Sequence, residues 1–92
     1  MAGAMSAIEA AKEQAARTAV QNHVKDGDVI GIGSGSTIVY VVEMLRELRE
    51  RNGLKVKCVP TSFQARQLIL KNGLDLTSLE VNPVIDVAID GN

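Results

Sequence analysis

The chain of 92 residues is short of aromatic residues, of cysteine and of clustered positive charge, and each shortage excludes a class of protein. Tyr40 and Phe63 are its only aromatic side chains, too few to form a platform on which nucleic-acid bases stack. Its 10 Lys and Arg are balanced by 11 Asp and Glu and form no basic stripe. We therefore expect no nucleic acid among its partners.

Cysteine and histidine are equally scarce. Cys58 is the only cysteine, so no disulfide forms within the chain, and a reducing, cytoplasmic setting is the simplest expectation. His23 is the only histidine, which leaves no His/Cys cluster at metal-ligand spacing and no Ser–His–acid set. We therefore expect no metal site, and we interpret Cys58 as a buried apolar residue and His23 as a favourable charge near a helix end.

Long apolar runs are also missing. None is long enough to cross a bilayer, and no hydrophobic segment of a signal peptide follows the first residues, so we expect no membrane partner. Residues 1–5 are interpreted as a tag or a disordered segment, and residues 6–92 as one small domain. Because 46% of the residues are apolar but few are aromatic, the core must consist of Val, Ile, Leu and Ala.

Helix-like and strand-like patterns alternate along the chain. Strands are predicted over 29–32, 55–59, 74–76 and 85–89, and a single helical turn from Thr77 to Glu80. Such alternation is typical of an α/β fold with a mainly parallel sheet and right-handed crossovers.

Three helices are predicted between these strands. The first begins at the N-cap Ser6 and runs to about Val24. Its narrow apolar stripe comprises Ile8, Ala11, Ala15, Ala19 and Val20. The second begins at Ser36 or Thr37 and ends at a left-handed Asn52-Gly53 cap, and its buried face comprises Ile38, Val41, Val42, Leu45 and Leu48. The third runs from a Thr61 cap to about Lys71, with Ala65, Leu68 and Ile69 on its inner face.

The first strand runs into a glycine-rich turn, Gly31-Ile-Gly-Ser-Gly-Ser-Thr37. Ser36 takes the place of the third glycine of a dinucleotide fingerprint, and no lysine precedes it as a Walker loop requires. A small phosphate fits better, because Ser34, Ser36 and Thr37 offer hydroxyls beside free N–H groups at a helix N-terminus. A tight turn whose hydroxyls merely cap the helix explains the same residues, and spacing alone does not decide between the two.

Two charged residues elsewhere have a plain and a functional interpretation. Lys12 lies in the first helix among alanines, where a solvated lysine is the plain interpretation. Asp90 follows a strand, so it lies at the same edge of the sheet as the glycine turn. Asp90 fits an ordinary Asp-Gly turn, or a carboxylate that binds sugar hydroxyls or takes part in proton transfer.

Three segments, in this order, resemble the N-terminal part of the type A ribose-5-phosphate isomerases. They are Gly31 to Thr37, residues 60–70 (Pro-Thr-Ser-Phe-Gln-Ala-Arg-Gln-Leu-Ile-Leu) and Ile85-Asp-Val-Ala-Ile-Asp-Gly91. The first helix, through Thr18 to Val24, is similar to the eukaryotic branch. The resemblance implies half of a three-layer, Rossmann-like α/β/α sandwich with sheet order 3-2-1-4, in which the glycine turn and Asp90 meet where the strand order reverses.

The resemblance also implies a site and an activity. The implied substrate-binding residues are Lys12, Ser34, Gly35, Ser36, Thr37, Asp90 and Gly91, with Asp90 also implied as catalytic. The implied reaction interconverts ribose 5-phosphate and ribulose 5-phosphate through an enediol(ate), in the pentose phosphate pathway, without a metal or other cofactor.

The chain departs from the family pattern at its end. Asn92 stands where the family has Ala, and the glutamate base has no counterpart in the 92 residues. We therefore expect a domain that is incomplete at its C-terminus, binds a sugar phosphate and is inactive alone. Two alternatives stay open: a non-catalytic sugar-phosphate-binding module, and an assembly piece whose fourth strand pairs with another chain, as in a homo-oligomer.

Overall fold

The computed structural model describes residues 6–91; the expected tag at residues 1–5 and the departure at Asn92 lie outside this range. Helices and strands alternate from α1 to β3 as the sequence predicts, and β4 follows β3 with no helix between them. Their order is α1 (Ala7–His23), β1 (Val29–Ile32), α2 (Ile38–Asn52), β2 (Lys57–Pro60), α3 (Phe63–Lys71), β3 (Asp75–Leu76) and β4 (Val87–Ile89). No helix within residues 6–91 combines the length and the apolarity needed to span a membrane.

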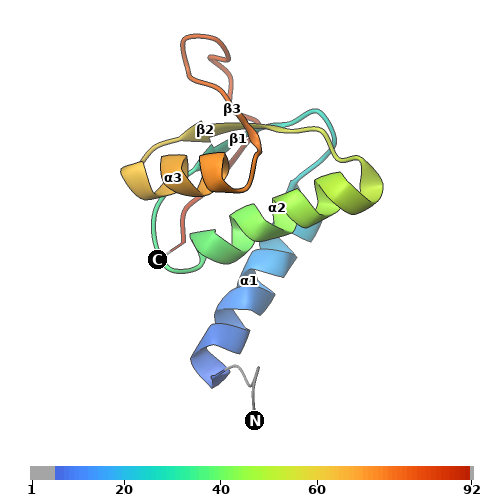
Figure 1. Cartoon of the computed structure of the whole chain (residues 1–92), viewed down its shortest axis with the longest axis vertical. Helices are drawn as coiled ribbons and strands as arrows, with labels where there is room; N and C mark the ends of the chain where they lie inside the picture. Colours follow the sequence, from blue (N-terminus) through green and yellow to red (C-terminus); the bar gives the residue numbers. More distant parts are fainter. Residues whose placement is uncertain (1–5, 92) are drawn as a thin grey trace.

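The four strands form one parallel sheet in the order β3-β2-β1-β4. Successive right-handed crossovers from β1 to β2 to β3 place α2 and α3 on one face, and α1 packs beside α2 (Figure 1). The connection from β3 to β4 runs in the opposite direction, so it crosses the other face, where Ile85 lies against Gly31. The α/β class and the strand order 3-2-1-4 are confirmed, with one helical layer contributed by the described residues.

The core lies between β1 and the helices. Every residue of β1 is buried, as expected for a central strand covered on both faces. Ile30, Ile32, Ile38 and Leu45 are completely inaccessible to solvent. The predicted inner faces of α2 and α3 are confirmed, with Leu48 and Leu68 at the margin of the core and Met44 as an additional buried residue.

The predicted stripe of α1 is confirmed only at its C-terminal end, where Val20 is buried and Ala19 is half-buried. It is wrong in the first half of the helix: Ile8 is 68% exposed, Ala11 and Ala15 also face solvent, and Ala16, which was not predicted, packs into the core. Alanines occur on nearly every side of this helix, so their pattern has little power to distinguish one face from the next. The helix position is therefore set by contact with α2 rather than by a strong apolar moment of its own.

The ends of several elements also differ from the prediction, for identifiable reasons. β2 begins at Lys57, because the Lys55 N–H donates to the Asp26 carboxylate at 2.7 Å and ties residue 55 to the preceding turn. The N-cap of α3 is Ser62 rather than Thr61, since Ser62 Oγ accepts from the Ala65 N–H at 3.0 Å.

The last two strands are shorter than predicted. β3 lacks Leu74, which packs into the core, and β4 begins at Val87, two residues later than Ile85. Asp86 is held just before β4, because its carboxylate accepts from the Val29 N–H at 2.8 Å. The predicted helical turn is an isolated turn closed by the Asn82 N–H donating to the Ser78 carbonyl.

Candidate functional site at the carboxyl edge of the sheet

The candidate site lies where β1 and β4 end side by side, at the point where the strand order reverses. Ligands of open parallel sheets bind at this kind of position. The Asp90 carboxylate, just after β4, accepts a hydrogen bond of 3.0 Å from the Ser34 N–H, just after β1. Gly33 makes this approach possible, because a Cβ at that position would lie 2.4 Å from Asp90 Oδ1.

Gly91 packs against the same turn. Its N–H donates to the Ser34 carbonyl at 3.0 Å. A Cβ on Gly91 would lie 2.8 Å from the Cβ of Thr37, so only glycine fits against the start of α2. The structure therefore brings together Asp90, Gly91 and the glycine turn, although 56 residues separate Ser34 from Asp90.

The N-terminus of α2 is open toward this edge. Gly35 has a φ of 115°, a conformation that favours glycine, and Thr37 already has helical dihedral angles. Thr37 is the N-cap residue of α2, but its side chain makes no capping hydrogen bond. Among the described residues, nothing accepts a hydrogen bond from the N–H groups of Ser36 and Thr37. These donors and the helix dipole favour an anion.

Two residues at the start of α3, which the sequence does not indicate as parts of the site, hydrogen-bond to the glycine turn: the N-cap Ser62 and Gln64 in the first turn. Ser62 Oγ donates to the Gly33 carbonyl at 2.9 Å. The Gln64 side chain bonds to Gly35 twice: Oε1 accepts from its N–H at 3.0 Å and Nε2 donates to its carbonyl at 2.9 Å. The capping-box spacing from Thr61 to Gln64 suggested only a local role, and no short-range signal links residue 64 to residue 35.

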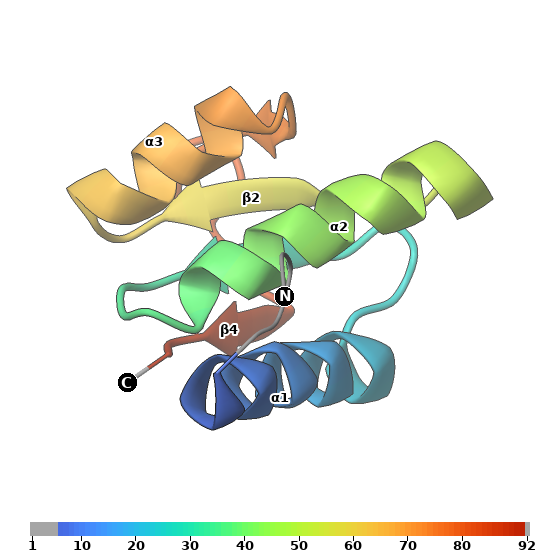
Figure 2. The same cartoon turned by 60° about the horizontal axis from the view of Figure 1, so that its bottom comes forward.

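Lys12 is half-buried in the middle of α1. The first half of α1 lies at the same end of the molecule as the C-terminal end of β4 and the turn before α2 (Figure 2). Within the described residues, the Lys12 ammonium group makes no hydrogen bond or ion pair. The structure therefore leaves its predicted role untested.

Among the described residues, the side chains of Cys58 and His23 make no hydrogen bond to the glycine turn. Cys58 is fully buried, and burial, followed by the charge of Asp75, raises the pKa of its thiol to about 12. His23 ends α1 and lines a groove of about 460 Å³ that also includes Asp90 and runs along β4. No group of three His, Cys, Asp or Glu side chains within residues 6–91 is placed to hold a metal.

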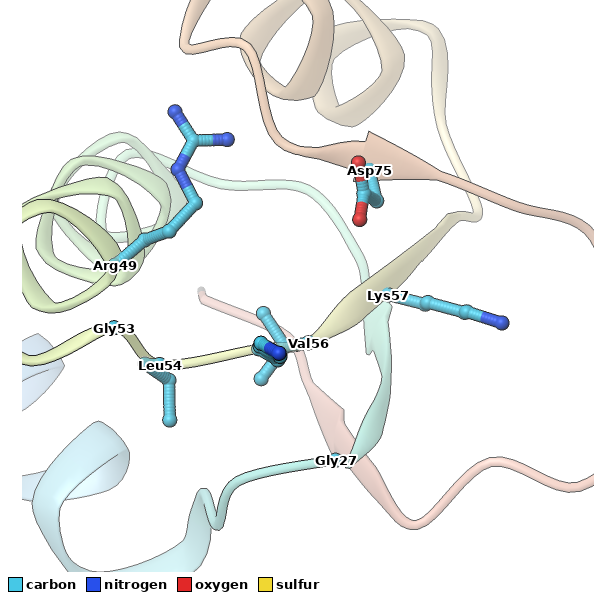
Figure 3. A pocket seen from close by; sticks show the side chains of 8 residues that line it. Gly27, Arg49, Gly53, Leu54, Val56, Lys57 and Asp75 are labelled. Carbon is cyan, nitrogen blue, oxygen red and sulfur yellow. The ribbon is translucent and has the colours of Figure 1, made fainter.

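A cavity of about 460 Å³ lies at the opposite end of the strands, where β2 and β3 begin. Figure 3 shows Arg49 and Asp75 on its rim, with Lys57 extending away from Arg49. The Arg49 guanidinium donates to the Gly73 carbonyl just after α3, so this cation already has a partner. The cavity is separate from the glycine turn.

Comparisons with known proteins give one consistent family. A model of ribose 5-phosphate isomerase A (phosphoriboisomerase A) matches residues 57–92. The ribose-5-phosphate isomerase of Sus scrofa is 55% identical over 87 residues, which is 95% of this chain and 28% of that protein. The chain thus spans less than a third of that relative.

Solved structures agree. Ribose 5-phosphate isomerase A of Methanocaldococcus jannaschii has a TM-score of 0.83 and 37% identity over 90% of this chain and 36% of its own. A D-ribose-5-phosphate isomerase in complex with phospho-erythronic acid has a TM-score of 0.84 and 38% identity, with the same coverage. The resemblance to the type A ribose-5-phosphate isomerases is confirmed in sequence and in fold.

Proposed function

We propose that this chain forms the sugar-phosphate-binding part of a ribose-5-phosphate isomerase, an aldose–ketose isomerase that interconverts ribose 5-phosphate and ribulose 5-phosphate. The observation that carries the proposal is the 3.0 Å hydrogen bond from the Ser34 N–H to Asp90, which joins two strand ends beside the open N-terminus of α2. The chain spans only 28% of its Sus scrofa relative, so we propose the isomerase activity for the protein to which this chain contributes, and not for the 92 residues alone.

The phosphate of the substrate binds at the N-terminus of α2. The N–H groups of Ser36 and Thr37 donate to its oxygens, and the hydroxyls of Ser34, Ser36 and Thr37 add donors of the same kind. Gly35 lets the backbone approach the ligand without a side chain. Lys12 supplies a compensating positive charge from α1. The structure of a relative with phospho-erythronic acid supports a phosphorylated sugar derivative as the ligand class.

Asp90 acts on the sugar rather than on the phosphate. An ionised carboxylate accepts hydrogen bonds and donates none. One oxygen of Asp90 already accepts from the Ser34 N–H. Its remaining capacity suits sugar hydroxyls and the proton movements between C1 and C2 that pass through an enediolate. Gly91, packed on Thr37, keeps Asp90 beside the phosphate subsite.

Isomerisation also needs a base within hydrogen-bond reach of the proton at C1 or C2. Among the described residues, Asp90 is the only carboxylate that hydrogen-bonds to the glycine turn, and one of its oxygens already accepts from the Ser34 N–H, so no second carboxylate is held there to serve as the base. We therefore expect the 92-residue chain to bind ribose 5-phosphate without turning it over. The alternative, a non-catalytic sugar-phosphate-binding module, uses the same site. The two functions differ in whether a catalytic base joins this site.

The experiment is isothermal titration calorimetry with ribose 5-phosphate and with unphosphorylated ribose. We expect saturable binding of the phosphate ester alone, weakened at least tenfold in Ser36→Ala/Thr37→Ala and to a smaller degree in Lys12→Met. Arg17→Met, which removes an exposed cation from the same helix, serves as the charge control. Equal affinity for ribose and ribose 5-phosphate contradicts the proposal, as does turnover by the purified chain in a coupled assay.

The single thiol, Cys58, supports a cytoplasmic location for the protein, since buried reduced cysteines are usual in that compartment.

A further inference from the structure

The side chain of Gln64 contacts the candidate site without facing its ligand. It reaches from the first turn of α3 to Gly35 and makes two hydrogen bonds with the backbone of that one residue, of 3.0 and 2.9 Å. A primary amide carries an acceptor oxygen and a donor NH2 group on the same carbon, so it pairs with the N–H and the carbonyl of a residue as a neighbouring strand does. Gln64 is half-buried, and its amide is therefore partly shielded from competing water.

This pairing fixes the direction of the next peptide group. In a trans peptide the carbonyl of one residue and the N–H of the following residue point in opposite directions. The Gly35 carbonyl accepts from Gln64 Nε2 and, at 3.3 Å, from the Ile38 N–H. The Ser36 N–H therefore points away from both of these donors, and it remains one of the N–H groups without an acceptor among the described residues.

Gly35 needs such support more than other residues of the turn. Glycine at a φ of 115° is free to leave this conformation, because no side chain restricts it. Ser34 is held by Asp90 and Gly91, and Gly33 by Ser62 and Ile89. Gln64 provides the only side-chain hydrogen bonds of Gly35 in the described part of the chain.

We propose that Gln64 is a positioning residue, which holds the Gly35–Ser36 peptide so that the Ser36 N–H is presented to an anionic ligand before the ligand arrives. The proposal rests on the function proposed above, since that ligand is the phosphate of a sugar phosphate. It assigns to Gln64 a role in affinity that is distinct from the stability of α3.

The test compares Gln64→Met with Gln67→Met. Gln67 lies on the same helix but is exposed, so the two substitutions change helix propensity equally and only one removes the bonds to Gly35. We expect Gln64→Met to weaken binding of ribose 5-phosphate about tenfold, the effect of roughly one lost pre-formed donor. Gln67→Met should bind as the unmodified chain does.

A charged pair of variants sharpens the comparison. Gln64→Glu keeps the acceptor for the Gly35 N–H but loses the donor to the Gly35 carbonyl and adds a negative charge beside the anion subsite. We expect it to bind ribose 5-phosphate more weakly than Gln64→Met, and more weakly than Gln67→Glu, which carries the same added charge on the exposed face.

Two measurements separate this proposal from a purely structural role and from the function itself. Amide hydrogen exchange of Gly35 in the ligand-free chain should become faster in Gln64→Met and not in Gln67→Met, whether or not ribose 5-phosphate binds. Unchanged Gly35 exchange, or lower unfolding stability with unchanged affinity, overturns the role of Gln64. Failure of the unmodified chain to bind ribose 5-phosphate overturns the proposed function, and the exchange result then decides whether Gln64 orders the turn.

Discussion

At the scale of single residues, the site depends on how closely two strand ends approach. Gly33 and Asp90 share a space that has no room for a Cβ, and Gly91 does the same against Thr37. The sequence indicates Ser34 because its hydroxyl lies in a glycine-rich turn before a helix, and Asp90 because it follows a strand that ends at the same edge of the sheet. It could not indicate Ser62 or Gln64 as parts of the site, because their partners are 29 residues away and their own spacing resembles a helix cap.

Gly33→Ala tests this close approach. The new Cβ forces the Asp90 side chain to turn away, which its exposed position allows at a cost of about 1 kcal/mol in the free energy of unfolding. Affinity for ribose 5-phosphate should fall at least tenfold, because Asp90 leaves the site. The control is Gly31→Ala, whose Cβ meets Ile85 on the far face at 3.2 Å and should lower stability only. Equal affinities in the two variants, by calorimetry, contradict the placement of Asp90.

The burial of Cys58 leads us to expect that the free energy of unfolding decreases at alkaline pH. Burial raises the pKa of its thiol from 9.0 to about 12, so between these values the unfolded chain loses a proton that the native chain keeps. The free energy of unfolding should therefore be unaffected by this group below pH 9 and decrease as the pH rises above 9, by up to about 1.4 kcal/mol per pH unit.

Urea unfolding from pH 8 to 10.5 measures this slope, and Cys58→Ala is the reference that lacks it. The two proteins should show the same pH dependence below pH 9 and separate above it. Identical slopes throughout, or rapid reaction of the native thiol with an alkylating reagent at pH 8, contradict the burial of Cys58.

At the scale of elements, the sequence predicts the buried face of a helix well only where large apolar residues recur at helical spacing. α2 was placed correctly because Ile, Val and Leu recur on one face and charges on the other, whereas the alanines of α1 gave the wrong face in the first half of that helix. The ends of β2, β3 and β4 were missed where a side-chain carboxylate or a core contact ends the ladder. Asp26 and Asp86 act in this way through bonds to distant backbone N–H groups, which no local pattern records.

Ser62 joins an element to the site, and Ser62→Ala should reveal both of its roles. Its Oγ caps α3 at Ala65 and also donates to the Gly33 carbonyl. We expect a loss of about 1–2 kcal/mol in the free energy of unfolding and weaker binding of ribose 5-phosphate. Ser6→Ala removes the matching cap of α1, a bond of 3.1 Å to the Glu9 N–H, and should cost about 1 kcal/mol without affecting affinity. The same binding loss in both variants would show that capping alone matters.

At the scale of the whole molecule, the described residues leave one strand at the edge of the sheet without a second partner and leave several apolar side chains exposed. β4 is an edge strand with one partner, β1, and Ala88 on it is exposed. Ile8 of α1 and Val81 and Val84 of the loop before β4 are each about 70% exposed, at 68%, 71% and 71%. An unprotected edge and exposed apolar side chains favour pairing with another chain.

We therefore predict that the 92-residue chain self-associates as its concentration rises, measured by multi-angle light scattering. Ala88→Lys should shift the chain toward the monomer, because charge on an edge strand opposes pairing. Lys71→Ala, on the exposed end of α3, serves as a surface control. A strictly monomeric chain at millimolar concentration, or self-association that Ala88→Lys leaves unchanged, rules out this edge as the interface.

The central claim is that the glycine turn holds the phosphate of a sugar phosphate, and a titration followed by ¹H–¹⁵N correlation spectra tests it most directly. With increasing ribose 5-phosphate, the amide signals of Ser36 and Thr37 should move furthest and saturate together, with smaller shifts at Ser34 and Gly91. Unphosphorylated ribose should leave them in place. Saturating shifts confined to the cavity around Arg49 and Lys57, or no shift at Ser36 and Thr37, would contradict the account.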